Sequence, residues 1–282
     1  MYLGQVTLCT VLVAIAFVAW TMSHENTEYT IIHGGGMPGP SPGNRVHIMS
    51  FNVYGLPDYI MLLRDNQTYA RDIASRIESE LHRYDVICLQ EVFSSSIQQE
   101  LDIMFGNHGW SVCRQSPTSI LHIRPDSGLY IASKWKMHMI QDYTFRSTSF
   151  TQPDSLVRKG AVGVYLPDLS TRIVNVHLVD SVFDSNHVTA TAQLHELRRH
   201  MGQAIYVGDF NVDNEPTRKE FGSVLGAAPV FPVQPTHRQL FTGKWDVLDG
   251  GFFPSHCKDT QVEVEPVDRS DHEMVHLSFR RV

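Results

Sequence analysis

The sequence has few cysteines, and none lies at the spacing of a metal site. Its 282 residues include four of them, Cys9, Cys88, Cys113 and Cys257. There is no Cys-x-x-Cys pair and no Cys/His spacing of the kind that holds zinc. Cys113 and Cys257 could form a disulfide in an oxidising compartment, and the sequence leaves this open.

An excess of positive charge is also missing. The chain carries 23 basic and 30 acidic side chains, a formal charge of -7 at pH 7. Proteins that bind nucleic acid without sequence preference normally present a basic surface, so this balance disfavours nucleic acid as a partner. The chain has no Gly-x-Ser-x-Gly motif, and the His-Gly-Gly-Gly of residues 33–36 therefore does not indicate a serine esterase.

The N-terminal apolar run, residues 6–20, is shorter than an ordinary membrane span. A span usually needs about 20 residues, whereas the core of a signal peptide needs about 7–15. No Lys or Arg precedes the run, while Glu25 and Glu28 follow it, which favours export of the C-terminal side. We therefore expect a signal peptide or signal anchor over residues 1–23, a Gly/Pro-rich linker over 24–44 and one folded domain over 45–282. The domain would be secreted, or held outside the cytoplasm by residues 6–20.

Apolar and alternating segments predict strands over residues 46–53, 85–92, 128–133, 161–166, 171–179, 205–208, 245–248 and 273–279. Apolar residues three and four apart predict helices over residues 68–83, 97–104, 187–202 and 217–225. Several strands within residues 128–179 follow one another without a helix. This order predicts an α/β protein in which two sheets pack together with helices outside, not a doubly wound parallel sheet.

Polar side chains gather where these strands end. The stretch at residues 205–213 is apolar up to Gly208 and then places Asp209 and Asn211 on one side of the strand end. Similar residues stand in or just beyond the other strands: Asn52, Glu91, Asn175, His177, Asp246, Asp271 and His272. A charged group in or next to a buried strand costs free energy unless it is paired or binds a metal. One such residue is usually structural, but their repetition at strand ends indicates a site.

The chemistry of these residues is coherent. Glu91, Asn52 and Asp271 offer oxygen ligands, which suit a hard cation such as Mg²⁺, with Mn²⁺ as a substitute. A carboxylate and an imidazole, such as Asp246 with His272, can form a base that activates water. No Ser or Cys nucleophile is apparent. The set therefore predicts metal-assisted attack of water on a phosphorus ester.

Five short blocks resemble, in order, those of the endonuclease/exonuclease/phosphatase superfamily, which includes deoxyribonuclease I and sphingomyelinases. They are residues 50–53 (SFNV), 89–92 (LQEV), 175–178 (NVHL), 208–211 (GDFN) and 270–273 (SDHE). The resemblance covers residues 45–282 and implies the deoxyribonuclease I-like fold. This fold is a four-layer sandwich of two packed, mostly antiparallel β-sheets flanked by helices.

Further stretches resemble the neutral and bacterial sphingomyelinase branch: residues 52–57 (NVYGLP), residues 90–93 (QEVF), and Asp154 followed by Lys159-Gly160-Ala161. The branch implies Mg²⁺-dependent hydrolysis of sphingomyelin, or of a related choline phospholipid, to ceramide and phosphocholine. The partners would then be a phospholipid membrane surface and the sphingolipid. Nucleic acid is disfavoured, and no protein partner is implied.

The resemblance also implies a role for each residue of the site. Glu91 would bind the metal, with Asn52 beside it and Asp271 nearby. His272 would be the general base, oriented by Asp246, with Asp249 as an alternative. The remaining roles are positioning of water by Asp209 and contacts with the phosphate or substrate by His177, Asn211, Asn175, Lys159 and Asp154.

Two other functions remain open at this stage. A nuclease of the same fold would need a basic groove, and the sequence shows no dense Lys/Arg cluster. A catalytically inactive relative that binds membranes or partners is disfavoured because every expected polar position is filled. Residues 59–63 could dip into a bilayer, or they could be the buried entry to the next helix.

Overall fold

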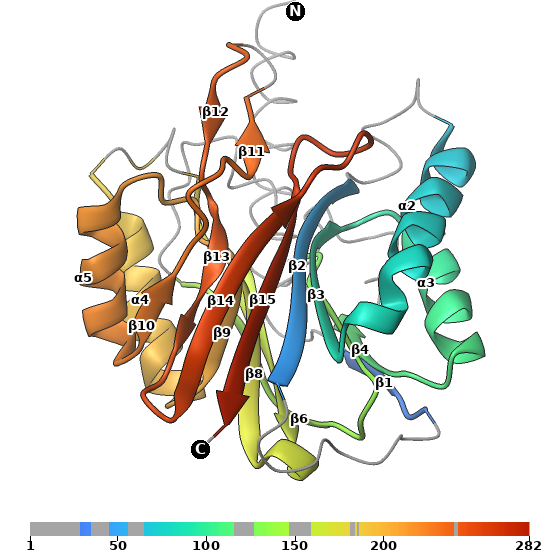
Figure 1. Cartoon of the computed structure of the whole chain (residues 1–282), viewed down its shortest axis with the longest axis horizontal. Coiled ribbons are helices and arrows are strands. Elements are labelled where there is room, and N and C mark those ends of the chain that lie inside the picture. The colour runs from blue at the N-terminus through green and yellow to red at the C-terminus, as the bar shows by residue number, and fades with distance from the viewer. Residues whose placement is uncertain are drawn as a thin grey trace, which may run out of the picture.

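The protein is a sandwich of two β-sheets with helices on both outer faces (Figure 1). The computed structural model describes residues 29–34, 45–55, 65–115, 127–146, 159–180, 184, 186–239 and 242–281. The segment 1–23 and the loop 59–63 lie outside these residues. Among the helices described, none is long and apolar enough to span a membrane.

The larger sheet has seven strands. Their order is β1 (Tyr29–Ile32), β4 (Ser111–Gln115), β5 (Tyr130–Ser133), β3 (Val86–Val92), β2 (Arg45–Gly55), β15 (Met274–Arg281) and β14 (Cys257–Glu265). Neighbouring strands are antiparallel except for β2 and β3. Strand β1 falls within residues 24–44, which the sequence predicted as a linker. Because β1 pairs with β4, the folded part of the chain begins before residue 45.

The second sheet has six strands, in the order β10 (Ala228–Val230), β13 (Asp249–Phe253), β9 (Ile205–Asp209), β8 (Thr171–His177), β7 (Gly160–Leu166) and β6 (His138–Thr144). Only β8 and β9 are parallel among these neighbours. A separate two-stranded ribbon, β11 (His237–Arg238) with β12 (Trp245–Asp246), stands above the sandwich in Figure 1. The predicted pair of mostly antiparallel sheets is thereby confirmed.

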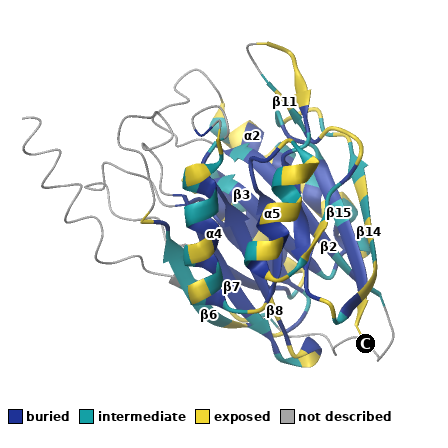
Figure 2. Cartoon of the chain, turned by 90° about the vertical axis from the view of Figure 1, so that its left-hand side faces the viewer, coloured by how far each residue is buried: buried dark blue, intermediate teal, exposed yellow. Residues whose placement is uncertain are grey.

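Each sheet carries two helices on its outer face (Figures 1 and 2). Helices α2 (Asn66–Glu80) and α3 (Ser95–Asn107) cover the seven-stranded sheet, and α4 (Val188–Met201) and α5 (Glu215–Leu225) cover the six-stranded sheet. Two short 3-10 turns, η1 (Leu81–Arg83) and η3 (Pro167–Leu169), complete the set. Three of the α-helices are capped at their start by a side chain that accepts a hydrogen bond from a backbone N–H of the first turn. The capping residues are Asp65 for α2, Ser94 for α3 and Asn214 for α5.

The central strands are buried on both faces, which explains their nearly continuous apolar sequence. In β2, Met49 and Phe51 pack toward α2 and α3, while Val46 and Ile48 pack between the two sheets. The layer between the sheets also holds Cys113 and Cys257. Both are free thiols, so the possible disulfide does not form.

The two parallel pairs determine where the site lies. Strands β2 and β3 end together, and so do β8 and β9, because parallel strands bring their carboxyl ends to one edge. Strand β9 needs a glycine here: Gly208 has a φ of 148°, and a Cβ at this position would lie 2.0 Å from the carbonyl oxygen of Val176. Asp209 is thereby set opposite His177 in the neighbouring strand.

Candidate active site

Side chains from both sheets meet at this edge around a pocket of about 240 Å³. The pocket contains most of the residues that the sequence singled out, together with residues from the β11–β12 ribbon. Its lining is Tyr54, Glu91, Lys159, His177, Asp180, Asp209, Asn211, His237, Gln239, Asp246, Leu248, Asp271 and His272.

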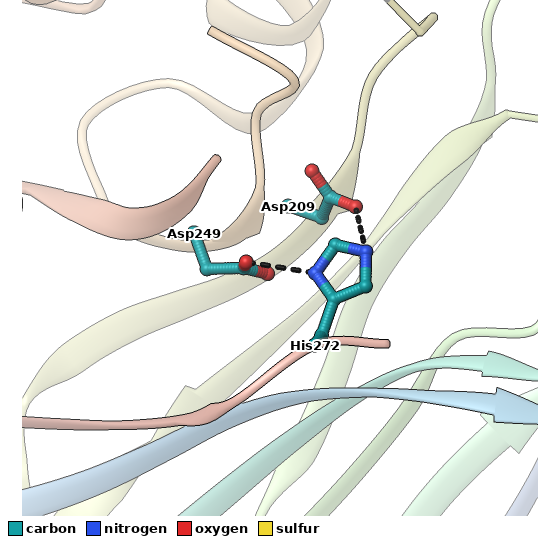
Figure 3. A group of neighbouring side chains, drawn as sticks. All are labelled: Asp209, Asp249 and His272. Carbon is teal, nitrogen blue, oxygen red and sulfur yellow. Dashed lines mark hydrogen bonds and ion pairs between the residues drawn. The ribbon is translucent and has the colours of Figure 1, made fainter. Parts of the chain in front are cut away.

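His272 is held by Asp249 (Figure 3). The Nδ1 atom of His272 lies 2.8 Å from Oδ2 of Asp249, and both side chains are almost fully buried. The hydroxyl of Thr236 accepts the backbone N–H of Asp249 at 3.1 Å and thereby fixes the start of β13. With Nδ1 engaged by the carboxylate, the Nε2 atom of His272 is left to face the pocket.

The expectation that Asp246 orients His272 is wrong. Its carboxylate accepts a hydrogen bond from Gln239 at 2.6 Å and pairs with the ammonium of Lys244 at 2.7 Å. Asp246 therefore ties the β11–β12 ribbon together at the rim of the pocket. Asp249, which the sequence offered only as an alternative, is the carboxylate that contacts the imidazole.

Asp209 lies at the centre of the site. Its Oδ1 accepts the backbone N–H of Asn211 at 3.0 Å, and its Oδ2 accepts the amide of Asn52 at 3.2 Å. The same Oδ2 is 3.8 Å from Nε2 of His272 (Figure 3). Burial, together with the negative charge of Asp249, raises the pKa of Asp209 to about 7.

Charge also sets the protonation state of His272. Burial alone would lower the pKa of His272, but the carboxylates of Asp249, Asp209 and Asp271 outweigh it and raise that pKa to about 10. At neutral pH the imidazole therefore carries a proton. Asp209, with a pKa near neutrality, is the neighbouring group that can accept one.

His177 faces Asp209 from strand β8 and is kept neutral. Burial and the nearby charge of Lys159 hold the pKa of His177 well below its usual range. The Nζ atom of Lys159 lies 2.5 Å from Nε2 of His177. The residue after this lysine must be small, because a Cβ at Gly160 would lie 2.4 Å from the carbonyl oxygen of Tyr143. Lys159 also lines the pocket, as its predicted contact with substrate requires.

The other wall of the pocket fits a cation. Oε2 of Glu91 is buried, and the described residues offer it no hydrogen-bond partner. Burial raises the pKa of the Asp271 carboxyl, and the negative charge of the nearby Glu91 raises it further. Two carboxylates that repel one another in a buried place, one with a free oxygen, form a donor set suited to a hard divalent cation.

Asp209, Asp249 and His272 form a second group that could hold a metal ion, since one ligand atom from each lies within 4.8 Å of the others. In this group the short hydrogen bond between His272 and Asp249 already uses the facing atoms. The unsatisfied oxygen of Glu91 makes the Glu91–Asp271 wall the better candidate.

Two residues expected at the metal or phosphate have other contacts. The amide nitrogen of Asn52 donates to Glu91 at 3.1 Å and to Asp209, while its oxygen accepts the backbone N–H of Tyr54 at 3.1 Å. Asn52 therefore orients the acids and is not placed as a metal ligand. Asn175 is fully buried between the sheets, beneath the pocket, and cannot contact a bound phosphate.

Two further residues, Asn211 and Asp154, were also expected at the phosphate or substrate. Asn211 lines the pocket, and its amide also donates to the carbonyl of Leu178 at 3.1 Å. Asp154 lies outside the described residues.

Comparison with known proteins shows the family to which the chain belongs. The model of the Endonuclease/Exonuclease/phosphatase family matches residues 49–269, most of the chain. The chain belongs to this family. No curated protein matches it by sequence.

Several solved structures have a similar fold. Sphingomyelinase C from Streptomyces griseocarneus superposes with a TM-score of 0.66 at 16% identity, covering 83% of this chain and 99% of the other. A beta toxin variant from Staphylococcus aureus with bound magnesium ions gives a TM-score of 0.61 at 16% identity, covering 84% and 100%. TDP2 from Caenorhabditis elegans gives 0.56 at 16% identity, covering 85% and 99%. At such identities the likeness establishes the fold.

For this member of the Endonuclease/Exonuclease/phosphatase family, the site is that of a hydrolase that can bind a metal ion. The residue that sequence reasoning missed altogether is His237. Its ring lies 4.5 Å from that of His272, centroid to centroid, and its Nε2 is 3.9 Å from Oδ2 of Asp271. It sits on the short strand β11 without an apolar run around it, so its sequence gives no signal.

Proposed function

We propose that this protein is a Mg²⁺-dependent phosphodiesterase that hydrolyses sphingomyelin, or a related choline phospholipid, to ceramide and phosphocholine. One observation carries the reaction type. The pocket is lined by Glu91, one of whose carboxylate oxygens is buried with no partner among the described residues, and by the imidazole of His272, which the buried carboxylate of Asp249 holds. The first can hold a cation, and the second can manage the proton of an attacking water.

The proton of this water has a short route. Nε2 of His272 and Oδ2 of Asp209 are 3.8 Å apart, a spacing in which one water can contact both. As the water oxygen bonds to phosphorus, its proton passes to this pair, the bond from phosphorus to the ceramide oxygen breaks, and that oxygen takes up a proton from solvent to give ceramide. Because the imidazole is already protonated at neutral pH, the base is the Asp209–His272 pair and not His272 alone.

Neighbouring groups would stabilise the charge that develops on the phosphoryl oxygens. Lys159 and Asn211 line the pocket on the side of the six-stranded sheet and can donate hydrogen bonds there, while His177 accepts from the ammonium of Lys159 and orients it. Mg²⁺ held by Glu91 and Asp271, or Mn²⁺ in its place, would polarise the phosphoryl group as a Lewis acid.

The choice of a lipid over a nucleic acid rests on charge and on the sequence blocks. The chain has a net charge of -7, and carboxylates line much of the pocket. The blocks at residues 52–57 and 90–93 resemble sphingomyelinases, and solved structures of that name share the fold. On this proposal the protein is secreted, or anchored by residues 6–20, and works at a phospholipid membrane surface.

A substrate panel tests the proposal. The purified protein would be given vesicles of sphingomyelin, lysophosphatidylcholine micelles, plasmid DNA and inositol phosphates, each with Mg²⁺ and with EDTA. We expect phosphocholine release from sphingomyelin that stops in EDTA. Metal-dependent nicking of plasmid without phosphocholine release would replace the proposal with the nuclease alternative, which membership of the Endonuclease/Exonuclease/phosphatase family keeps open.

A further inference from the structure

The site is assembled from two halves that lie on different sheets. Asn52 and Glu91 come from the seven-stranded sheet, and His177 and Asp209 from the six-stranded sheet. The distances between the halves are short: 4.0 Å from Nε2 of His177 to Oε1 of Glu91, and 3.2 Å from Asn52 to Asp209. Whatever fixes one sheet against the other therefore fixes the geometry of the reaction.

Apolar packing alone fixes this placement poorly, because the hydrophobic effect has no direction. Among the side chains packed between the sheets are two buried amides, Gln90 of β3 and Asn175 of β8. Nε2 of Gln90 donates to Oδ1 of Asn175 at 2.7 Å. Burying an amide costs free energy where its hydrogen bonds are not made. The described residues offer Oε1 of Gln90 no partner, so the bond from its Nε2 to Asn175 is the contact that favours one placement of the sheets over others.

Asn175 also makes hydrogen bonds to the backbone of the seven-stranded sheet. Its Nδ2 donates to the carbonyl oxygens of Leu89 at 2.7 Å and of Tyr130 at 3.1 Å. Leu89 and Tyr130 form the last registered pair of the β3–β5 ladder. One side chain of the six-stranded sheet thus holds two strands of the other sheet at the point where their pairing ends.

The residue that follows this contact is strained. Glu91 has a φ of 58°, in the left-handed region that non-glycine residues rarely occupy. Such a conformation persists only where the surroundings enforce it. Gln90 immediately precedes Glu91, and Asn175 is two residues before His177 on the same face of β8. The amide pair therefore lies directly under both halves of the site.

We propose that Gln90 and Asn175 are positioning residues that lock the end of β3 against β8 and so hold the Glu91 carboxylate at its place opposite His177 and Asp209. Neither side chain lines the pocket, so neither touches substrate. The inference uses the proposed function only for one of its readouts. It also gives a role to Asn175, which lies two residues before His177 and does not line the pocket.

The decisive variant replaces both amides by apolar side chains of similar size, Gln90→Met with Asn175→Leu. Replacing both partners of a buried hydrogen bond by groups of the same shape can be nearly neutral for stability, but the carbonyl oxygens of Leu89 and Tyr130 also lose the Asn175 donor, and this loss is destabilising. We therefore expect the double variant to fold, with an unfolding temperature somewhat below that of the wild type. Thr171→Val is the matched control: it removes a buried hydroxyl from the same strand, and that hydroxyl donates only to the carbonyl of Leu169.

Crystal structures of the double variant and the control test the inference without any activity. In the double variant we expect Glu91 to leave its left-handed conformation, and the separation of its carboxylate from His177 to grow by about 1 Å or more, whereas Thr171→Val changes neither. A double variant that keeps both the conformation and the 4.0 Å separation would overturn the inference. This holds even if the wild type turns out to hydrolyse another substrate.

Cation binding and turnover give the functional readout. A misplacement of about 1 Å can lower a catalytic rate by roughly 100-fold, and loss of a supporting contact weakens metal binding by about 10–100-fold. We expect both effects in the double variant, measured by calorimetry with Mn²⁺ and by kcat on the best substrate of the panel. Equal losses in Thr171→Val would show that any buried polar group of β8 matters and would refute a specific role for the pair.

Discussion

Asp249 donates no proton to the reaction, yet its loss should be among the most damaging single changes. It holds His272 at 2.8 Å and, with Thr236 behind it, fixes the direction in which the imidazole points. We expect Asp249→Ala to lower kcat by about 100-fold or more, because general acid–base catalysis of this kind contributes 10²–10⁴-fold.

Asp246→Ala is the matched control, three residues away. Its carboxylate pairs with Lys244 and Gln239 at the pocket rim and does not touch His272. We expect a small change in KM and a kcat near that of the wild type. Equal losses of kcat in the two variants, measured on the same substrate, would mean that the imidazole is not held as described.

At this scale the sequence could predict the kinds of residue but not all of their contacts. Asp246 was the expected partner of His272 and Asp249 its alternative, since both lie in or just after the expected strand at residues 245–248. The chain turns between β12 and β13, and this break in the alternation decides which carboxylate faces inward. Asn175 was expected at the phosphate for a similar reason: alternation puts it on the same face as His177, but says nothing of depth.

Among the structural elements, strand β9 depends most on one residue. A Cβ at Gly208 would overlap the carbonyl oxygen of Val176, and its φ of 148° is strained for any other residue. Gly208→Ala should therefore destabilise the protein by about 3 kcal/mol or more, through overlap and backbone strain together. It should also separate His177 from Asp209 and abolish turnover.

The control is a glycine with room around it. A Cβ added at Gly106 in α3 would meet no atom within 4 Å, and the φ of this residue is not positive. Gly106→Ala should raise the unfolding free energy by up to about 1 kcal/mol, because alanine is the better helix former. Chemical denaturation of both variants measures the two effects, and a loss in both would contradict the local explanation.

The elements themselves were predictable where burial leaves a pattern. Strands β2, β3 and β8 and the four long helices lie close to the ranges expected from apolar periodicity. Strand β14 was missed because it alternates between exposed and half-buried residues and carries Lys258, Asp259, Glu263 and Glu265. Strand β1 was missed because it is short and leads into Gly/Pro-rich sequence.

For the molecule as a whole, the buried site should set how stability depends on pH. The pKa of His272 is raised from 6.5 to about 10 by the carboxylates around it. A raised pKa means that the folded protein binds the proton more tightly than the unfolded chain. Its stabilisation is complete below pH 6.5 and is lost as the pH rises toward 10.

We therefore expect the melting temperature, measured in EDTA, to fall between about pH 7 and 9. For a single proton the slope is at most about 1.4 kcal/mol per pH unit. Asp249→Asn removes the charge that raises this pKa most, so its curve should be flatter than that of the wild type. A wild-type curve that stays flat or rises over this range would show that His272 is not held in a field of carboxylates.

At the scale of the whole molecule, the prediction that the sequence supported best was that blocks far apart in the chain form one site. The sequence blocks predicted one site, and in the structure the parallel pairs β2–β3 and β8–β9 bring the polar groups at their ends to one edge of the sandwich. The order of the strands and the ribbon that carries His237 could not be inferred, because they depend on pairings between segments far apart in the chain.

The most direct test of the account is the Mg²⁺ dependence of sphingomyelin hydrolysis in Glu91→Gln and His272→Gln. If Glu91 holds the cation, Glu91→Gln should need at least about 10-fold more Mg²⁺ for half-maximal activity. If His272 handles the proton, His272→Gln should stay inactive at every Mg²⁺ concentration. A Glu91→Gln variant with the Mg²⁺ requirement of the wild type, or wild-type hydrolysis that continues in EDTA, would contradict the central claim.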